Sequence, residues 1–363
     1  MRYALIMAGG SGTRLWPMSR AALPKQLIPF INGQSLLQLA YDRLNDLVPA
    51  ANRFICAGQK HADVICRALD LPADQFIGEP TGRDTLNAVG FSAAVIAQRD
   101  PNAVIAVFTA DHVIQPVDQF QKIVDHGYRL VEQAPNTLVT FGITPAVAAT
   151  SYGYLQHGQS IDESARVVEQ FREKPDIATA QQYFAAGSTR YLWNSGMFVW
   201  RASTLLDCIR RYEPANHAGL MKIGGAWPTP QRHTVLGEVF PTLKKISVDF
   251  AVMEPAGRDP QVRVAAVPMP LQWLDVGSWP MFAETCRHDD AGNALGTDRV
   301  LLLDTRDTVV ASNDPKHLIT TIGCDNLVII HTADATLVCR KDKAEAIKEL
   351  QQQVAKKFGP QMV

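Results

Sequence analysis

Short apolar runs alternate with amphipathic segments through the first part of the chain, and this alternation restricts the fold more than any other feature. Five runs have the character of buried strands, and they occupy residues 3–8, 53–57, 75–77, 103–109 and 138–143. Three intervening segments have helical spacing of apolar residues, and they occupy residues 35–48, 86–98 and 117–132. This order predicts an α/β fold with a mixed, mainly parallel sheet and helices on both faces. Ligands bind such sheets at the carboxyl ends of the strands.

The pattern changes twice farther along the chain. Between residues 152 and 267 it is mixed, and we interpret this part as an elaboration of the same domain, with a helix over 203–212. After Asn293 the segments VLLLDT, TVVAS, HLITTI, LVIIHT and ATLVCR recur about every eight to ten residues. They predict a small β-rich unit, similar to a short β-helix. We therefore expect an α/β domain over residues 1–292 and a β-rich unit over residues 293–363.

The last segment predicts a terminal amphipathic helix. Asp342 and Glu345 have the spacing of a capping box, and Ile347, Leu350 and Val354 form an apolar stripe behind them. Because such a stripe has to be covered, the helix is expected to dock on its own chain or to pair with another one. The chain could therefore form a homodimer through its C-terminal region.

Composition argues against several classes of function. The 363 residues are 47% hydrophobic and 20% charged, as in a globular protein with a large core. A formal net charge of -1 gives no basic footprint, so neither nucleic acid nor a membrane is expected as a partner. The six cysteines have no CxxC spacing and indicate neither a zinc site nor a disulfide framework. Without a secretory signal or an apolar run of about 18 residues, the expected location is the cytoplasm.

A glycine-rich loop with three cations follows the first predicted strand. In MRYALIMAGGSGTRLWPMSRAALPKQ, the Gly-Gly-Ser-Gly run at 9–12 leaves backbone amides open to a ligand. Arg14, Arg20 and Lys25 add positive charge, which favours a phosphate. The alternative is an ordinary strand-to-helix turn with solvated cations, and Arg20 could serve in either role. Neither the GxxxxGK[ST] loop nor a complete GxGxxG fingerprint is present, so P-loop and dinucleotide-binding proteins are not favoured.

The opening stretch resembles the signature of sugar-nucleotide pyrophosphorylases, in the form typical of mannose-1-phosphate guanylyltransferases. Further matching motifs follow in the expected order, namely TADH at 109–112, YGY at 152–154, FREKP at 171–175, WNSGMF at 193–198 and WLDVGSW at 273–279. The resemblance spans nearly the whole chain. It implies a Rossmann-like, GT-A-like nucleotidyltransferase domain over residues 1–292, Mg²⁺ as cofactor, and transfer of GMP from GTP to mannose 1-phosphate with release of pyrophosphate.

The resemblance also implies which residues act. Arg14 and Lys25 match the catalytic positions, and Asp111 and Asp275 match the aspartates that hold the metal. The residues at nucleotide-binding positions are Ala8, Gly9, Gly10, Gly12, Glu79, Gly82 and Asp111. Those at sugar-phosphate-binding positions are Gly153, Glu173, Lys174 and Asn194. All of them precede Asn293, so removal of the tail is expected to leave residual catalysis. In the segment that resembles the nucleobase loop, positions 84–87 are Asp-Thr-Leu-Asn where many relatives have Asn-Thr-Ala-Pro.

The chemistry of the residues agrees with this reaction. A sugar 1-phosphate is already an anion, because a phosphate monoester has its second pKa near about 6, so no activated side-chain nucleophile is required. The reaction needs cations and amides that stabilise the departing pyrophosphate. Two alternatives stay open: transfer to another base or hexose 1-phosphate, and a catalytically silent nucleotide-sugar-binding subunit that regulates a partner. The isomerase activity that is fused to some relatives is not expected, because no cupin-like segment follows Val363.

Overall fold

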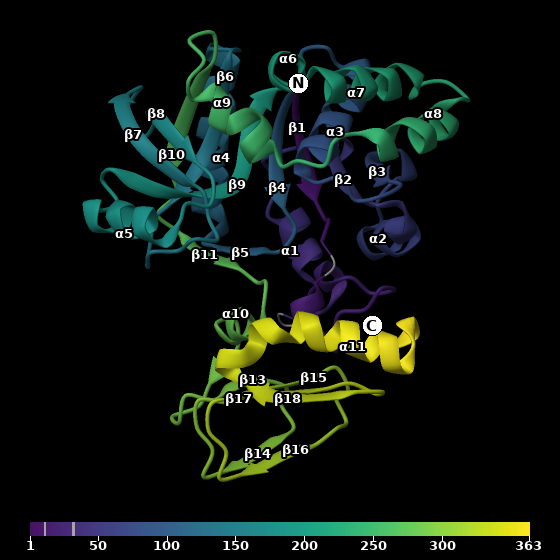
Figure 1. The fold of residues 1–363 in the computed structure, drawn as a ribbon, viewed down its shortest axis with the longest axis vertical. Helices are drawn as coiled ribbons and strands as arrows, with labels where there is room; N and C mark the ends of the chain where they lie inside the picture. Colours follow the sequence, from purple (N-terminus) through teal and green to yellow (C-terminus); the bar gives the residue numbers. More distant parts are fainter. Residues whose placement is uncertain (11, 31–32) are drawn as a thin grey trace. The chain divides into compact units, whose positions relative to one another are not determined.

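The computed structural model describes residues 1–10, 12–30 and 33–363, and the chain divides into two compact units (Figure 1). The first unit consists of Met1–Ala8, Tyr41–Thr109 and Ile114–Trp273, and the second of Gly9–Ala40, Ala110–Val113 and Leu274–Val363. Ser11 of the predicted glycine loop lies outside the described residues. The predicted division between 292 and 293 separates two continuous segments of chain, and it stays a prediction.

The first unit is built on a nine-stranded sheet. Its strands are β1 (Arg2–Met7), β2 (Arg53–Gly58), β3 (Phe76–Glu79), β4 (Val104–Thr109), β6 (Thr137–Ile143), β7 (Tyr154–Ser160), β8 (Arg166–Arg172), β9 (Tyr191–Arg201) and β10 (Arg263–Pro268). Their order is β3-β2-β1-β4-β9-β6-β10-β8-β7. The strands from β3 to β4 are parallel, whereas β9 runs antiparallel to β4 and β6. The predicted fold class is confirmed, and each predicted apolar run coincides largely with one of these strands.

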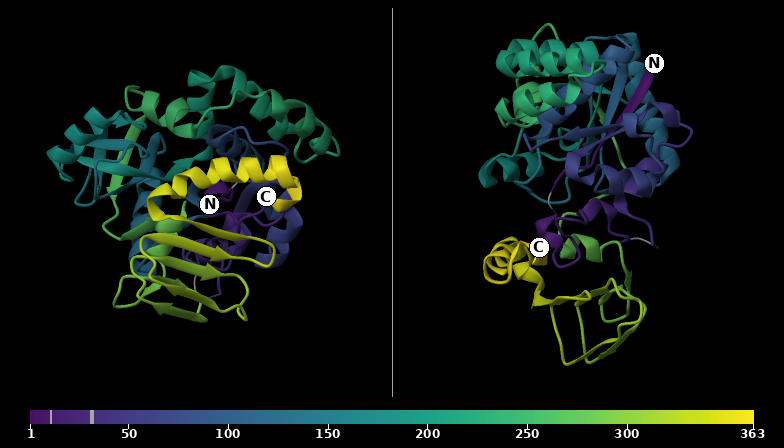
Figure 2. Two further views of the ribbon diagram at one scale, coloured as in Figure 1. Left: turned by 60° about the horizontal axis from the view of Figure 1, so that its bottom comes forward. Right: turned by 90° about the vertical axis from the view of Figure 1, so that its right-hand side faces the viewer.

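Helices cover both faces of this sheet, as Figure 2 shows. Those of the first unit are α2 (Ala62–Leu69), α3 (Thr85–Arg99), α4 (Val117–Gln133), α5 (Ile177–Ala186), α6 (Ala202–Tyr212), α7 (Pro214–Ala226), α8 (Arg232–Val239) and α9 (Glu254–Ala256). Helix α3 is buried from Leu86 to Ile96, because it packs between strands of the sheet and the helices α6 and α7. Helix α4 has a narrower apolar stripe that includes Phe120, Val124 and Tyr128.

The helix predicted over 35–48 is shorter in the structure. Helix α1 spans Leu36–Asp42, and the chain then continues through tight turns to Val48. Asp46 has a φ of 64°, a left-handed conformation that is incompatible with a right-handed helix continuing to residue 48. Apolar periodicity therefore extends farther along the sequence than the helix itself.

The second unit contains the predicted β-rich segment. Its strands are β12 (Arg287–His288), β13 (Ala294–Gly296), β14 (Val300–Leu303), β15 (Val309–Ser312), β16 (Ile319–Ile322), β17 (Leu327–His331) and β18 (Thr336–Arg340). They form one sheet in the order β12-β13-β15-β17-β18 and a second that pairs β14 with β16. The strands β13, β15 and β17 are parallel, as are β14 and β16, so the chain coils from one sheet to the other. A β-rich unit similar to a short β-helix is confirmed.

Two further strands lie where the chain passes between the units. They are β5 (His112–Gln115) and β11 (Gln272–Asp275), and they form a two-stranded sheet. The backbone N–H of Val276, just after β11, donates to the carbonyl oxygen of Asp111 at 3.1 Å. This hydrogen bond joins Asp111 of the TADH motif to Val276 of the WLDVGSW motif within the second unit.

A separate apolar core holds the second unit together. Trp16 joins Trp279 and Phe282 of α10 (Trp279–Ala283) in this core, and Ile347 enters it from the terminal helix α11 (Ile347–Phe358). The indole N–H of Trp16 donates to the carbonyl oxygen of Met362 at 2.9 Å. The predicted terminal helix is confirmed, and its buried residues pack on its own chain.

The predicted capping box is wrong. Asp342 lies on a 3₁₀ turn (Lys341–Ala346), where its carboxylate accepts two hydrogen bonds from Arg340 at 2.8 and 2.9 Å. Helix α11 begins only at Ile347, after Ala346, which offers no side-chain cap. The neighbouring guanidinium competes successfully for the carboxylate that was expected to cap the helix.

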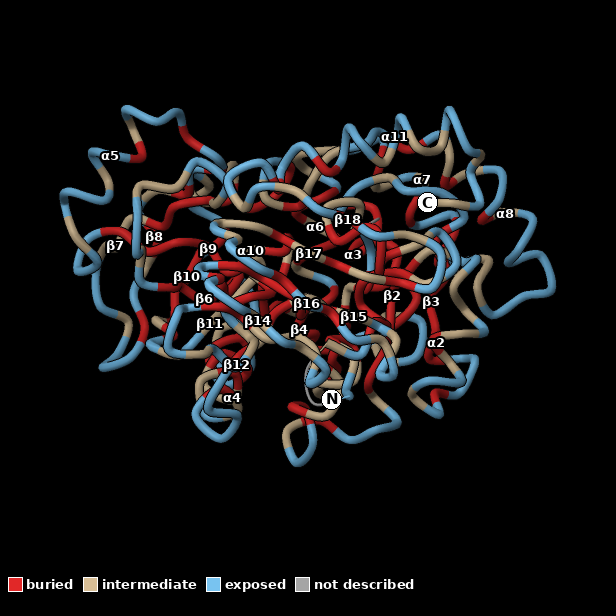
Figure 3. The backbone as a smooth tube through the Cα atoms, turned by 90° about the horizontal axis from the view of Figure 1, so that it is seen from below, coloured by how far each residue is buried: buried red, intermediate tan, exposed pale blue. Residues whose placement is uncertain are grey.

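Burial is concentrated in central strands of the large sheet, such as β4, β6 and β9, as Figure 3 shows, whereas the outer faces of the helices are exposed. The first unit has its own core around Phe91, Phe198 and Trp200. Among the described residues, no helix combines the length and the apolar character that a membrane span requires.

Candidate active site

The glycine-rich loop borders a cavity in the second unit. Its volume is about 400 Å³, and its lining residues are Gly9, Gly10, Gly12, Thr13, Arg14, Lys25, Asp111, Gly277, Glu345 and Lys348. The opening loop, the turn after β4 and the start of the C-terminal helical segment therefore meet at one place. Six of these residues were predicted as site residues from the sequence, whereas Thr13, Gly277, Glu345 and Lys348 were not.

The loop adopts a shape that favours glycine. Gly10 and Gly12 have φ values of 103° and 59°, in the left-handed region that other residues rarely adopt. A Cβ atom at Gly12 would lie 2.7 Å from the Cβ of Lys25, so the lysine side chain crosses directly over the loop. The hydroxyl of Ser19 donates to the carbonyl oxygen of Gly12 at 2.6 Å, which fixes this turn.

Lys25 is buried and forms an ion pair with Asp111. Its Nζ donates to Oδ2 of Asp111 at 2.6 Å and to the carbonyl oxygen of Val276 at 3.4 Å. Burial by itself raises the pKa of Asp111, but the charges of Lys25 and His112 outweigh it and lower the pKa. Asp111 is therefore ionised, and it keeps the lysine ammonium oriented within the cavity.

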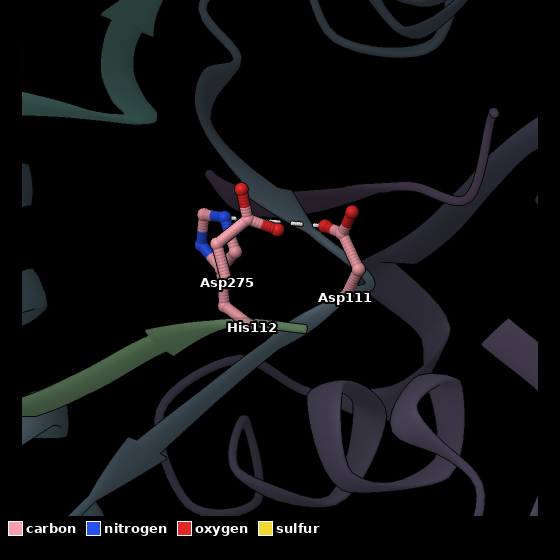
Figure 4. Close-up of side chains that lie close together, drawn as sticks. All are labelled: Asp111, His112 and Asp275. Carbon is pink, nitrogen blue, oxygen red and sulfur yellow. Dashed lines mark ion pairs between the residues drawn. The ribbon is translucent and has the colours of Figure 1, made fainter. Parts of the chain in front are cut away.

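Three potential metal ligands lie together beside this ion pair (Figure 4). Single ligand atoms of Asp111, His112 and Asp275 all lie within 4.8 Å of one another. Burial, followed by the negative charge of Asp111, raises the pKa of Asp275. Two carboxylates that repel each other at close range favour a cation between them, and hard oxygen ligands are those that Mg²⁺ prefers. The donor set therefore fits a divalent metal ion of the predicted kind.

The two arginines of the opening stretch have different surroundings. Arg14 lines the cavity, and its Nη1 donates to the two carboxylate oxygens of Glu345 at 2.9 and 3.1 Å. Arg20 instead pairs with Asp334 at 2.6 Å and donates to the carbonyl oxygen of Met362. Arg20 thus ties down the C-terminal end of the chain, and this contact resolves the ambiguity that the sequence left.

The predicted sugar-phosphate residues form a second group, which lies in the first unit. The carboxylate of Glu173 is buried and pairs with the ammonium of Lys174 at 3.0 Å. A Cβ atom at Gly153 would lie 2.5 Å from Oε2 of Glu173, so any other residue there would require this carboxylate to shift. The side-chain oxygen of Asn194 accepts a hydrogen bond from Thr140 at 2.7 Å, which orients the amide.

Sequence reasoning missed a second acidic residue in this group. Asp249 begins a π-helical turn (Asp249–Met253) and accepts a hydrogen bond from the side-chain amide of Asn194 at 2.9 Å. Burial, followed by the negative charge of Glu173, raises its pKa. The available signal was an aspartate in the otherwise apolar stretch ISVDFAVM, where a charged residue needs partners.

The predicted nucleobase loop also belongs to the first unit. Glu79 ends β3 and is buried; burial, together with the charge of Asp84, raises its pKa to about 7. Gly82 is exposed, and a Cβ atom there would meet no other atom within 4 Å. Ala8 follows β1, and its backbone N–H donates to the carbonyl oxygen of Cys56, so this amide already has a partner.

Comparison with known proteins identifies the family. The model of the family described as Nucleotidyl transferase matches residues 3–291. The chain belongs to this family. A second family model, described as MannoseP isomerase/GMP-like beta-helix domain, matches residues 298–354 of this nucleotidyltransferase and so coincides with its coiled β-rich segment.

Individual relatives align with almost the whole length of this nucleotidyltransferase. The xanthan biosynthesis protein XanB of Xanthomonas campestris is 35% identical over 96% of this chain and 72% of that protein. A mannose-1-phosphate guanylyltransferase of Salmonella muenchen is 36% identical over 95% of this chain and 72% of that protein. A solved Thermus thermophilus structure, described as a mannose-1-phosphate geranyltransferase, is similar with a TM-score of 0.85 at 30% identity, over 97% of this chain and 99% of that chain.

The nucleotidyltransferase thus carries two groups of polar side chains with different chemistry. The cavity of the second unit combines a glycine loop, the cations Arg14 and Lys25 and the carboxylate of Asp111, which lies close to that of Asp275; this combination suits a polyphosphate and a metal ion. The group in the first unit combines Glu173, Asn194 and Asp249, which can donate to and accept from hydroxyl groups. Lys174 adds a positive charge to the second group.

Proposed function

We propose that this nucleotidyltransferase transfers GMP from GTP to mannose 1-phosphate, which gives GDP-mannose and pyrophosphate. The observation that carries the proposal is the cavity lined by the glycine loop and by the Lys25–Asp111 ion pair, with Asp275 close to Asp111. The names of relatives that align with nearly the whole chain supply the base and the sugar.

In the proposed reaction the phosphate oxygen of the sugar 1-phosphate attacks the α-phosphorus of the nucleotide. The bond to the β-phosphate breaks, and pyrophosphate leaves with the electron pair. The loop amides of Gly9, Gly10 and Gly12 and the guanidinium of Arg14 bind the triphosphate, and they stabilise the charge that moves onto the pyrophosphate. The buried ammonium of Lys25 holds phosphate oxygens at the reacting centre, because Asp111 fixes its direction.

Asp111 and Asp275 would hold Mg²⁺, which when bound neutralises phosphate charge at this place. In the first unit, Glu173 and Asn194 would bind sugar hydroxyls beside Gly153, and Lys174 would pair with the 1-phosphate. Glu79 and the backbone around Gly82 would receive the base, since a carboxylate accepts from the ring N–H and the amino group of guanine. Ala8 would contribute at the start of the loop through its backbone.

We also propose a cytoplasmic enzyme that forms a homodimer through its C-terminal region, with no nucleic-acid or membrane partner. Three apolar side chains on the paired strands β14 and β16 support the interface. Leu301, Leu303 and Ile322 are 68%, 62% and 75% exposed, and they form a patch that a second copy of the chain could cover.

The test is a panel of GTP, ATP, UTP and CTP against mannose 1-phosphate and glucose 1-phosphate, with pyrophosphate release as the readout in the presence of Mg²⁺. GTP with mannose 1-phosphate should give the highest kcat/KM. Equal kcat/KM with another nucleotide or sugar would contradict the proposed specificity and support only a general sugar-phosphate nucleotidyltransferase. If no pair released pyrophosphate although nucleotide sugars bound, the chain would be a silent binding subunit.

A further inference from the structure

We infer that the C-terminal helical segment is part of the nucleotide site: Glu345 holds Arg14 until a triphosphate replaces it, and Lys348 adds a cation to the phosphate cavity. The inference rests on the proposed function and adds two residues to its nucleotide site. Both side chains lie on the part of the chain that the sequence alone places outside the catalytic machinery.

The contact between the segment and the cavity is direct. The Nη1 atom of Arg14 lies 2.9 Å from one carboxylate oxygen of Glu345 and 3.1 Å from the other. Glu345 and Lys348 line the same cavity as the glycine loop and Lys25. In this cavity, the carboxylate of Glu345 would therefore compete with a triphosphate for Arg14. The ammonium of Lys348 would attract the triphosphate.

Packing holds the two side chains at this position. Ala344 and Ile347 are buried in the core of the second unit, which also contains Leu15, the residue next to Arg14. Glu345 and Lys348 follow these buried residues by one position each, so they share the neighbouring face of the helical segment. The Met362 carbonyl accepts from Trp16 and Arg20 and so ties the chain end to the opening stretch, which also fixes the segment.

The ion pair is suited to exchange. The side chain of Arg14 is 43% exposed and that of Glu345 is 74% exposed, and pairs with this exposure contribute little to stability. A triphosphate carries several negative charges and offers parallel oxygen acceptors, so it binds a guanidinium better than a single exposed carboxylate does. Glu345 therefore keeps Arg14 at the cavity without preventing the arrival of the nucleotide.

The experiment measures equilibrium binding of pyrophosphate and of GTP by calorimetry, without mannose 1-phosphate, to the full-length protein. Glu345→Gln keeps the shape of the side chain and removes its charge, so both ligands should bind roughly two- to fivefold more tightly. Lys348→Ala should weaken both by roughly three- to tenfold. In an Arg14→Ala background, Glu345→Gln should have no effect, because the residue for which it competes is absent.

Matched controls lie on the same helix. Glu349→Gln and Lys356→Ala remove the same charges at exposed positions of α11 and should leave both affinities unchanged. Unchanged or weaker binding in Glu345→Gln, or a gain that persists without Arg14, would overturn the role of Glu345. Unchanged binding in Lys348→Ala would overturn that of Lys348. A wild-type protein that does not bind GTP would instead refute the proposed function, so the two failures are distinguishable.

Discussion

Charged side chains of the candidate site are paired within the chain before any substrate is present. Lys25 is held by Asp111, and Arg14 is held by Glu345. Such pairing prevents repulsion among the cations of the phosphate cavity, and it orients each one without a ligand. If an anionic substrate replaced Glu345 as the partner of Arg14, water would solvate the released carboxylate, which is 74% exposed.

The proposed metal ligands give the first prediction at this scale. Asp111→Asn and Asp275→Asn each replace a charged ligand by a neutral one, so turnover should fall about 100-fold or more, and the Mg²⁺ concentration for half-maximal rate should rise. Steady-state kinetics over a range of Mg²⁺ concentrations checks both effects. Asp298→Asn is the control, since that side chain is 97% exposed in the same unit. A folded variant with near-normal turnover would remove its residue from the metal site.

Glu79 gives a prediction about pH. Its pKa in the folded protein is raised from 4.5 to about 7, so between these values the folded state binds more protons than the unfolded state. The contribution of this group to stability is therefore present below pH 4.5 and is lost as the pH rises through 7. Relative to the wild type, Glu79→Gln should gain free energy of unfolding between pH 5 and pH 8.5, on the order of 1–3 kcal/mol.

Denaturant unfolding at the two pH values measures this gain. Glu349→Gln, which changes an exposed carboxylate, should show no such trend. If the difference in free energy of unfolding between Glu79→Gln and the wild type were independent of pH, the Glu79 carboxyl would titrate normally. Its burial would then not change its charge toward a bound nucleobase.

At the scale of elements, the glycine loop and the segment that contains Lys25 depend on each other. Gly12 has both a left-handed φ and a close contact with the Lys25 side chain, whereas Gly33 has a φ of 78° and open space around its Cα. The two positions therefore separate backbone strain from the loss of this contact. Each substitution by alanine costs the strain of the left-handed conformation, about 1–2 kcal/mol.

Gly12→Ala should consequently destabilise the protein more than Gly33→Ala, and it should also lower kcat, because the new methyl group displaces Lys25. Gly33→Ala should lower the free energy of unfolding and leave kcat near that of the wild type. Thermal melting and steady-state kinetics on both variants check the prediction. Equal losses of stability with unchanged kcat in both would show that the contact with Lys25 has no catalytic consequence.

At the scale of the whole molecule, the chain forms two compact units, each with its own apolar core. The core of the second unit already buries residues of the terminal helix, so that helix needs no second chain to cover them. The exposed apolar patch lies instead on β14 and β16. The proposed homodimer therefore depends on the coiled strands rather than on the buried side of the helix.

The double variant Leu301→Asp and Ile322→Asp should accordingly convert a dimer into a monomer, because charges in an apolar interface would be buried without partners. Sedimentation velocity across a range of concentrations is the measurement. Val338→Asp, at an exposed position on β18 of the other sheet, is the control and should not change the assembly. A wild type that stays monomeric at high concentration would contradict the proposed homodimer.

The sequence by itself predicted the fold class, because apolar periodicity reports which faces of each element are buried. It also predicted a phosphate loop, since glycines leave backbone amides accessible and the neighbouring cations add positive charge, and the resemblance supplied Glu173 and Asn194 as predicted site residues. The capping box was wrong because other charged side chains take both of its carboxylates. The spacing of Asp342 and Glu345 predicts a cap, but Arg340 takes the first carboxylate and Arg14 the second.

Only the tertiary structure could place Glu345 and Lys348 at the cavity, more than three hundred residues from the glycine loop. It likewise brought Asp249 to Asn194. Periodicity along a helix or strand is a local property, and it tells which side of an element is buried but not which distant element covers that side. Charged side chains pair with whatever the packing of the core brings near them, so the partners of Arg14 and Asn194 are consequences of the assembled fold.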